Sequence, residues 1–392
     1  MPSIVIATPS LVPNDAVGND ILIQKKYLEQ SFFKPPVYLY AENIHSSYSQ
    51  YCISEKEVLD HLSCRSNTLI YHHSVYWPKI DSIIKLAQAS VVMKYHNITP
   101  DRFFRDYDKL AAYFCAMGRQ QTRSLLPLCT GGVLSDSEYN AAEVNDIGEY
   151  LPRSFVIPPF VKFEELECEE PCNDLLAALR KKTAIKLLFV GRVAPNKGHR
   201  HLVKALARYI ELFGNDIELN IVGGKSPGLV DYYLELEELI GSYGIGEHIN
   251  FLDHLAYDEL LAYYQGSDIF LCLSEHEGFC VPILEAQKMS LPVVAVDCGA
   301  VKDTLGEGQL CFDDFDYDVL ATAINEVCKR EGLKESLIKA GHENILRYDA
   351  SVTAKRLVDC LYLSKEAAAA KRNKERQQGL ASGIRLFDEG PI

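Results

Sequence analysis

Short apolar runs alternate with longer segments of helical periodicity from one end of this chain to the other. Six runs rich in β-branched residues precede residue 160, at 4–8, 37–40, 68–72, 90–95, 132–135 and 154–157. Six more follow residue 180, at 185–190, 217–222, 249–252, 269–273, 292–296 and 310–312. Near-continuous apolar strands separated by helices predict parallel sheets that are covered on both faces.

Helices are expected where apolar residues recur on one stripe and a cap residue or glycine ends the pattern. This predicts helices over residues 19–33, 197–213 and 229–243, the last ending before Gly244. The segment 364–378 has high helix propensity but is polar on nearly every side. It is predicted to pack by one edge or to project into solvent.

Two series of strands in one chain predict an α/β protein with two doubly wound, Rossmann-like domains and a cleft between them. The length of 392 residues also exceeds what one hydrophobic core usually supports. We assign residues 1–160 and 161–360 to the two domains, and 361–392 to a helical tail. The acidic, proline-containing stretch 158–173 is the expected linker.

Composition is that of a globular protein, with 47% hydrophobic and 24% charged residues. The first apolar run has no basic segment before it and resembles a buried strand more than a signal peptide, so we expect a cytoplasmic protein. Twelve cysteines are scattered, and the close pair Cys168 and Cys172 has no histidine nearby. We therefore expect reduced thiols and no zinc site.

The net charge of −14 lies almost entirely in the second half of the chain. Residues 1–160 hold 14 Lys and Arg against 16 Asp and Glu, whereas the rest holds 26 against 38. An acidic second half argues against nucleic acid as a partner. The nearly neutral first half leaves open a local basic face for an anionic carrier or a membrane surface.

Residues 267–294 are predicted to form a strand, a polar loop, a helix and another strand. Pro282 suits the first helical turn, where its missing N–H costs nothing. The backbone amides that precede it would then be free at a helix N-terminus, which favours phosphate binding. These amides belong to Gly278, Phe279, Cys280 and Val281.

Two carboxylates frame this loop, Glu277 before the turn and Glu285 one turn into the helix. Each can accept hydrogen bonds from two neighbouring hydroxyl groups of a sugar. The loop resembles the E-x7-E motif of retaining GT-B glycosyltransferases, specifically glycosyltransferase family 4. That resemblance implies that Glu277 contacts the donor hexose and Glu285 the ribose. Two solvated acids beside a helix start are the alternative interpretation.

A second element, strand, tight turn and helix, carries Gly191, Arg192 and Lys197. Two cations beside a glycine turn can neutralise a diphosphate leaving group. The glycine pattern of a P-loop is missing, as is the Ser or Thr after Gly-Lys. The segment resembles the GR…K element of the same family, which implies that Arg192 and Lys197 bind the donor phosphates. Surface cations at a helix start are the alternative.

The first half contributes His96, directly after a buried strand. It resembles the family's strand-end histidine, which faces the transferred sugar near the reacting centre. His72 and His73 end the preceding strand and are candidates to line the same cleft. Gly18, expected just before the first helix, resembles the family's loop that approaches phosphate and acceptor, although that loop commonly has two glycines.

The Asp-x-Asp pattern within residues 313–318 resembles the metal ligands of other transferases. It opens a predicted helix, where acids oppose the helix dipole, so we expect no metal site. No cofactor is expected beyond the nucleotide sugar itself, which is a substrate.

The resemblance implies metal-independent transfer of a hexose from a nucleoside diphosphate sugar to a saccharide hydroxyl, with retained configuration. The first domain would bind the acceptor and the second the donor, and domain closure would complete the site. A sugar-nucleotide epimerase of the same fold and a non-catalytic binding subunit are the alternatives from other classes. Transfer of glucose or GlcNAc from a UDP-sugar is the alternative within the family.

The sequences of residues 97–104 and 137–143 resemble those of transferases that build bacterial surface polysaccharides, often mannosyltransferases. This favours GDP-mannose over a UDP-hexose, with the base near His254 and Leu255. The acceptor would be a saccharide or a lipid-linked saccharide. Lys25, Lys26, Phe32 and Phe33 suit contact with the inner face of a membrane, although such charges are usually a solvated face.

Overall fold

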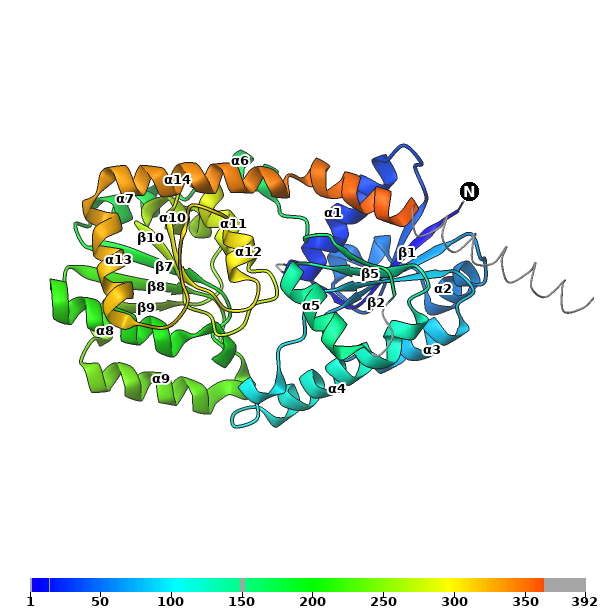
Figure 1. The fold of residues 1–392 in the computed structure, drawn as a ribbon, viewed down its shortest axis with the longest axis horizontal. Coiled ribbons are helices and arrows are strands. Elements are labelled where there is room, and N and C mark those ends of the chain that lie inside the picture. The colour runs from blue at the N-terminus through cyan, green and yellow to red at the C-terminus, as the bar shows by residue number, and fades with distance from the viewer. Residues whose placement is uncertain (1, 14, 149–151, 363–392) are drawn as a thin grey trace, which may run out of the picture.

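A computed structural model describes residues 2–13, 15–148 and 152–362 of the chain and shows the predicted pair of doubly wound α/β domains (Figure 1). The first domain has a parallel sheet in the order β2-β1-β3-β4-β5-β6. The second has a parallel sheet in the order β12-β11-β10-β7-β8-β9. Helices cover both faces of each sheet, as parallel strands require.

The first domain contains β1 (Ile4–Leu11), α1 (Ala16–Gln30), β2 (Val37–Ile44), α2 (Glu55–Leu62), β3 (Thr68–His73), α3 (Pro78–Leu86), β4 (Ser90–Tyr95), α4 (Lys109–Leu125), β5 (Gly132–Ser135), α5 (Glu138–Ile147) and β6 (Ser154–Val156). All residues of β3 and β5 are buried, because both strands lie inside the sheet with helices on either face. The order places the carboxyl ends of β1, β3, β4 and β5 along one edge.

The second domain contains α7 (Asn173–Lys181), β7 (Ile185–Val190), α8 (His199–Phe213), β8 (Ile217–Val222), α9 (Val230–Tyr243), β9 (Ile249–Leu252), α10 (Tyr257–Gly266), β10 (Ile269–Cys272), α11 (Val281–Lys288), β11 (Val293–Val296), α12 (Val301–Leu305), β12 (Leu310–Phe312), α13 (Tyr317–Lys329) and α14 (Glu331–Ile345). Its central strands β10 and β11 are completely buried. The loop from β10 to α11 therefore starts from a rigid sheet.

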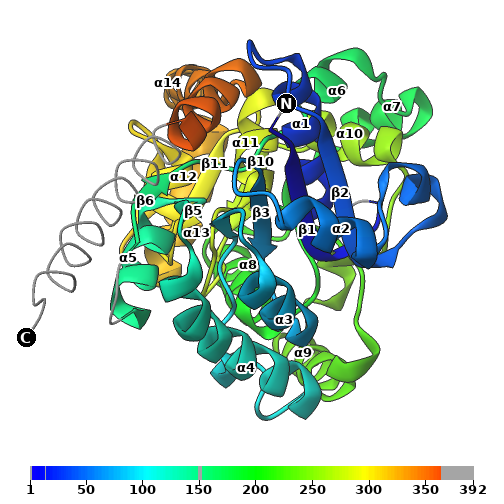
Figure 2. The same cartoon turned by 90° about the vertical axis from the view of Figure 1, so that its right-hand side faces the viewer.

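The chain passes between the domains twice. The predicted linker contains a short helix, α6 (Phe163–Cys168), whose Leu166 is buried. After α14, a helix over residues 350–362 returns to the first domain, where it lies beside α1 in both views (Figures 1 and 2). Leu357 and Leu361 join the core formed by Ile4 and Ile21. Residues 350–360 were predicted as part of the second domain, and this packing places them on the first.

Two helix starts differ from the sequence prediction for physical reasons. α1 begins at Ala16 because the Asp15 side chain accepts a hydrogen bond from the Gly18 amide and caps the helix. α8 begins at His199 because Gly198 takes a left-handed conformation after a 3-10 turn, Pro195–Lys197. α9 ends as predicted, before Gly244 with φ of 65°. The predicted helix 364–378 lies outside the described residues.

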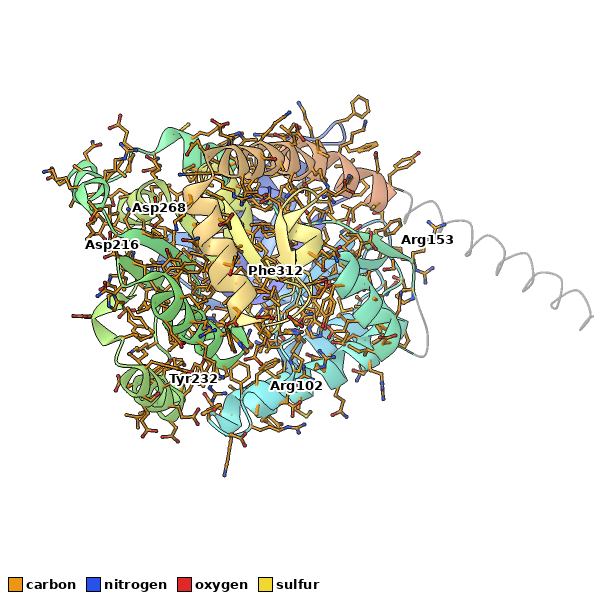
Figure 3. All side chains as sticks on the ribbon, turned by 60° about the vertical axis from the view of Figure 1, so that its left-hand side comes forward. Arg102, Arg153, Asp216, Tyr232, Asp268 and Phe312 are labelled. Carbon is orange, nitrogen blue, oxygen red and sulfur yellow. The ribbon has the colours of Figure 1, made fainter. Side chains whose placement is uncertain are left out.

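The two domains contact each other in two places. Near α9, the ring centroids of Tyr107 and Tyr232 lie 5.3 Å apart, and the Tyr107 hydroxyl donates to Glu235 at 2.9 Å. Figure 3 shows Tyr232 on the second domain and Arg102 on the first domain at this contact. The other contact joins the β4–α4 and β10–α11 loops and belongs to the site described below.

Candidate functional site

Glu277 lies in the β10–α11 loop and is only 6% exposed. The ammonium group of Lys197 lies 2.8 Å from both of its carboxylate oxygens. The Ser274 hydroxyl donates to Oε1 of the same carboxylate at 2.7 Å. The two segments predicted from sequence to form the donor pocket therefore meet in one ion pair. A carboxylate held by three hydrogen bonds is oriented to bind, and its lone pairs are less available for attack.

Lys197 is positioned by the close approach of two backbone segments. It ends the 3-10 turn before Gly198, whose φ is 68°. A Cβ at Gly198 would come 1.8 Å from the Leu273 carbonyl oxygen, so only glycine fits here. Burial lowers the pKa of Lys197, but the Glu277 carboxylate outweighs this and leaves that pKa raised. The ammonium is therefore fully charged at neutral pH.

Arg192 lies in the turn after β7 and is exposed. Its charge acts on Lys197, Cys115 and Tyr233, so it lies close to the Lys197–Glu277 ion pair and to α4 of the first domain. Within the described residues, its guanidinium makes no hydrogen bond or ion pair. An exposed, unpaired guanidinium beside a buried ammonium can accept an anionic ligand at low cost, since no existing ion pair has to break.

The four predicted amides lie at the start of α11. Cys280 is the residue before the helix and has φ of 73°. The Gly278 carbonyl accepts a hydrogen bond from Ser137 Oγ at 2.9 Å, and the Phe279 carbonyl accepts one from Thr304. No amide of residues 278–281 donates to another group in the described part of the chain. The carbonyls are thus fixed and the N–H groups remain available to an anion.

Glu285 lies one turn into α11 and is half-buried. The Tyr264 hydroxyl donates to its Oε2 at 2.7 Å. Burial raises the pKa of Glu285, and the Tyr264 hydrogen bond offsets only part of that rise. One carboxylate oxygen is engaged, and the other makes no hydrogen bond within the described residues.

The raised pKa of Glu285 makes a pH dependence testable. Because the ionised form accepts hydroxyl hydrogen bonds best, nucleotide affinity should fall as pH drops through this pKa, which lies above 4.5. The contribution of Glu285 to folding stability changes in the opposite direction and decreases as the pH rises. The reason is that the folded chain retains a proton on Glu285 that the unfolded chain loses above pH 4.5. Calorimetric titration with GDP and UDP at several pH values measures the first effect. Glu285→Gln should bind more weakly and lose the pH dependence, and an unchanged pH profile would contradict the assignment.

Gly191 and His254 lie near each other across neighbouring strand ends. The Gly191 amide donates to the Val222 carbonyl at 2.8 Å, and a Cβ at Gly224 would come 2.3 Å from His254 Nε2. His254 is exposed and Leu255 half-buried. Both predicted base-binding residues therefore border the glycine turns after β7 and β8, as a nucleotide site at the carboxyl edge requires.

His96 directly follows β4, and its side chain is only 6% exposed. Its Nδ1 lies 2.8 Å from Asp136 Oδ2, and its Nε2 lies 2.8 Å from His72 Nδ1. Lys94, completely buried, pairs with the other oxygen of Asp136 at 2.7 Å. Burial raises the pKa of Asp136, but His96 and Lys94 outweigh it and leave that pKa lowered. Both ring nitrogens of His96 are thus engaged inside the first domain.

Three of the predicted cleft residues lie elsewhere. His72 is completely buried beneath His96, where burial holds its pKa well below the ordinary value. His73 is also buried and points to the opposite face, towards Tyr71 and Thr122 at 2.8 Å each. This follows from strand geometry, because consecutive side chains alternate between faces. Gly18 lies inside the first turn of α1 rather than before it.

His96 and Asn97 form the first-domain side of the contact with the β10–α11 loop. Asn97 has φ of 69°, and its Oδ1 lies 2.8 Å from His276 Nε2. Its Nδ2 donates to Asn140 and to Glu143, each at 3.0 Å. A Cβ at Gly278 would come 2.5 Å from Asn97 Cβ. The histidine-containing turn therefore meets the donor loop through its backbone and through Asn97.

Several site residues were missed by the sequence analysis. Asp136 directly follows β5 and could have been found by the same strand-end rule that identified His96. Asp20 carries no local signal, because it lies on α1 and reaches His72 and His96 only in the folded chain, at 3.7 and 3.8 Å. Its Oδ2 is buried and makes no hydrogen bond. Burial raises the pKa of Asp20.

Two sets of side chains contain residue types that can bind a metal ion. Asp20, His72 and His96 each offer one ligand-type atom within 4.8 Å of the others. The two ring nitrogens of this group already share a hydrogen bond. In the Asp-x-Asp segment, Asp316 caps α13 by accepting from the amides of Asp318 and Val319. That segment thus has the helix-capping role predicted for it.

The sequence profile of the family described as "Glycosyl transferases group 1" matches residues 176–344. This range contains Glu277, Glu285, Arg192 and Lys197. Over this range, which is less than half of its length, the chain is similar to the group 1 glycosyl transferases. The two parallel six-stranded sheets of the described residues form the predicted GT-B fold, and the family match agrees with the resemblance found in the sequence.

Two glycosyltransferases are similar in sequence to part of this chain. It is 30% identical over 233 residues to a D-inositol 3-phosphate glycosyltransferase of Corynebacterium urealyticum, covering 57% of this chain and 55% of the relative. It is 31% identical over 176 residues to a phosphatidyl-myo-inositol mannosyltransferase of Mycobacterium leprae, covering 44% and 45%. The chain spans about half the length of the curated relatives it matches.

Two solved structures have the same fold over nearly the whole length of this chain. HepE of Anabaena, in complex with UDP and glucose, has a TM-score of 0.70 at 18% identity and covers 92% of this chain and 100% of its own. Sucrose-phosphate synthase of Thermosynechococcus elongatus has a TM-score of 0.69 at 17% identity, covering 93% and 100%. At these identities the likeness shows the shared fold.

Proposed function

We propose that this chain transfers a hexose from a nucleoside diphosphate sugar to a hydroxyl group of a saccharide acceptor, with retained configuration. The observation that carries the proposal is the meeting of Lys197 with Glu277 beside the free amides of residues 278–281. A diphosphate needs cations and N–H donors, and a hexose needs a fixed carboxylate.

In this proposal the departing diphosphate is stabilised by Arg192, Lys197 and the N-terminus of α11. These groups supply the positive potential that a metal ion supplies elsewhere, which makes the reaction metal-independent. Glu277 orients the hexose, Glu285 accepts hydrogen bonds from the ribose, and a diphosphate oxygen takes the proton of the acceptor hydroxyl. Closure of the cleft excludes water from the reacting carbon.

We favour mannose from GDP-mannose as the donor. The name of one relative, a mannosyltransferase, supports mannose, whereas the UDP and glucose bound to one structural neighbour support a UDP-hexose. Thermal-shift measurements against GDP-, UDP- and ADP-sugars test this directly, since a bound donor raises the melting temperature by mass action. A shift with GDP-mannose alone supports the assignment. A shift with a UDP-sugar alone would replace it, and no shift with any donor would contradict the proposed function.

We further propose that the reaction takes place on the cytoplasmic side of a membrane, with a lipid-linked saccharide as acceptor. Phe32 is 94% exposed and Phe33 54% exposed, just after α1, and Lys26 is more than half exposed nearby. Aromatic side chains beside cations suit an anionic lipid surface. Among the described residues, no helix is long and apolar enough to cross a bilayer.

Replacement of Phe32 by serine should weaken binding to phosphatidylglycerol-containing vesicles by about tenfold, because an inserted phenyl ring contributes about 1.5 kcal/mol or more. Co-sedimentation with vesicles measures the bound fraction. Leu86→Ser is the matched control, since Leu86 is 66% exposed on α3 and away from α1. Equal binding of wild type and Phe32→Ser would remove Phe32 from the proposed membrane surface.

A further inference from the structure

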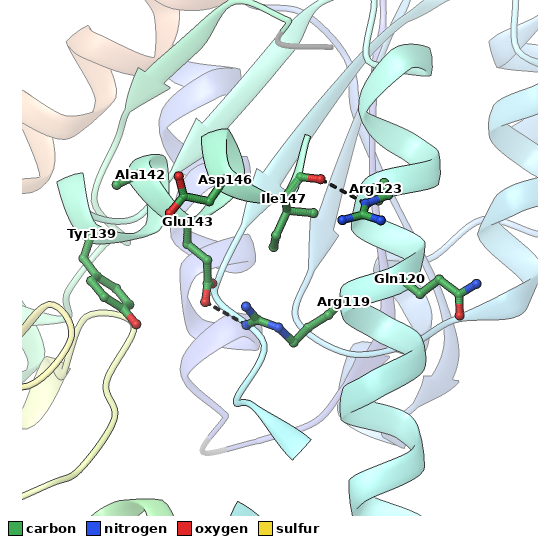
Figure 4. Close-up of a pocket in the computed structure, with 8 residues that line it drawn as sticks. All are labelled: Arg119, Gln120, Arg123, Tyr139, Ala142, Glu143, Asp146 and Ile147. Atoms are coloured by element: carbon green, nitrogen blue, oxygen red, sulfur yellow. Dashed lines mark hydrogen bonds and ion pairs between the residues drawn. The ribbon is translucent and has the colours of Figure 1, made fainter. Parts of the chain in front are cut away.

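A cavity of about 630 Å³ lies between α4 and α5 of the first domain (Figure 4). Arg119 and Arg123 line it from α4, and Tyr139, Glu143 and Asp146 line it from α5. The cavity is separate from the donor pocket, whose groups come from the second domain. Its size is in the range of ordinary small-molecule sites.

The side chains around this cavity have hydrogen-bonding capacity that the protein does not use. The Arg123 guanidinium donates through Nε to the Ile147 carbonyl at 3.1 Å, and its terminal nitrogens make no hydrogen bond within the described residues. Asp146 makes no hydrogen bond or ion pair in the same part of the chain. The Tyr139 hydroxyl makes no hydrogen bond there either. Donors and acceptors are thus both available in one concave space.

The charges of the cavity balance, because two guanidinium groups face two carboxylates. Arg119 is already paired, donating to Glu143 at 2.7 Å and to the Ile98 carbonyl at 2.9 Å. A phosphate entering here would meet the carboxylates of Glu143 and Asp146 as well as the cations. A neutral ligand with many hydroxyls can use both kinds of group, because each hydroxyl donates and accepts. The Tyr139 ring can cover the C–H face of a sugar.

The inner wall of the cavity is connected to the proposed reaction site. Glu143 accepts hydrogen bonds from Tyr95 at 2.7 Å and from Asn97 at 3.0 Å. Asn97 in turn lies 2.8 Å from His276, the residue before Glu277. The Tyr139 ring also meets the His276 ring edge-on, with centroids 5.9 Å apart. A ligand in the cavity would therefore be held by the domain opposite the donor, next to the contact that closes the cleft.

From this placement we propose that the cavity is a subsite for a neutral sugar residue of the acceptor, held by Arg123 and Asp146 with Tyr139 as its apolar wall. The inference rests on the proposed function for its role in transfer, but binding itself can be measured without turnover. In this proposal, α4 and α5 recognise the acceptor. The acceptor is then a saccharide of more than one unit, because its reacting hydroxyl lies beside the donor and not in the cavity.

Saturation-transfer difference NMR with methyl α-D-mannopyranoside and methyl α-D-glucopyranoside tests the subsite in the full chain. At least one glycoside should receive saturation from the wild-type protein. Asp146→Ala and Arg123→Ala should each weaken that binding by about tenfold, because each removes a charged hydrogen-bonding partner. Asp146→Ala is the safer variant, since Asp146 makes no hydrogen bond or ion pair with the residues that the structure describes. Arg65→Ala, an exposed arginine of the same domain outside the cavity, should leave the signal unchanged.

Three results would overturn the subsite: no signal from either glycoside with the wild type, equal signals in wild type and both cavity variants, or displacement of the glycoside by millimolar inorganic phosphate in an Arg123-dependent way. The last result would make the cavity an anion site. Donor-induced thermal shifts on the same proteins separate this from the proposed function. A cavity variant that keeps the donor-induced thermal shift but loses the glycoside signal supports the subsite. A wild-type protein that shows a glycoside signal but no donor-induced shift would refute the donor assignment alone.

Discussion

Replacement of Lys197 by alanine is expected to lower kcat/KM for sugar transfer by about 10³-fold, on the scale of losing a preorganised charge-stabilising group. Two effects combine in this variant. The diphosphate loses its buried cation, and Glu277, only 6% exposed, keeps Ser274 as its remaining side-chain partner. Steady-state kinetics with the donor identified by thermal shift measure the loss.

Breaking one partner of a buried ion pair also destabilises the fold, so melting temperature has to be measured beside activity. Lys197→Ala should melt lower than the wild type but remain folded at assay temperature. Lys181→Ala is the matched control, because Lys181 is an exposed lysine of the same domain at the end of α7. Wild-type turnover in folded Lys197→Ala would remove this lysine from the phosphate site.

Replacement of Gly278 by alanine should lower kcat/KM by about 10²-fold by preventing the loops from closing. The added methyl group would come 2.5 Å from Asn97 Cβ and 3.0 Å from the His96 carbonyl oxygen. Both contacts lie across the cleft, so the strain can be relieved by separating the domains rather than by unfolding. The melting temperature should therefore change little while turnover falls.

Small-angle X-ray scattering with saturating donor distinguishes this cause from a local defect at Gly278. The variant should have a larger radius of gyration than the wild type under the same conditions. Gly241→Ala serves as the control, because a Cβ at Gly241 on α9 meets nothing within 4 Å. A compact Gly278→Ala protein with normal turnover would show that this loop contact does not limit closure.

Every strand in the described part of the chain was predicted from the sequence, because buried parallel strands produce local apolar runs. β1 extends three residues beyond its prediction, to Leu11, because Pro9 and Ser10 interrupt the apolar run without ending the strand. Residues 350–360 were assigned to the second domain but pack on the core of the first, because sequence order does not reveal which core a late helix joins.

The donor side of the site could be predicted because its groups lie in two continuous segments around Lys197 and Glu277. On the first-domain side, His72 and His96 were predicted from strand ends and Asp136 follows the same rule, whereas Asp20 lies on α1 and approaches the two histidines only through tertiary packing. His73 was misplaced because neighbouring residues on a strand face opposite sides. The orientation of His96 into the domain depends on Asp136, whose partner role has no signature in its local sequence.

In the proposed reaction, this chain breaks the bond between a hexose and a nucleoside diphosphate beside Glu277. Proton NMR of the wild type with the stabilising donor and no acceptor tests it most directly. We expect slow release of nucleoside diphosphate, with the unchanged sugar appearing first as the α anomer, and loss of this release in Lys197→Ala. Release of an epimerised sugar, or a bound donor that stays intact both alone and with the saccharide acceptors tested, would contradict it.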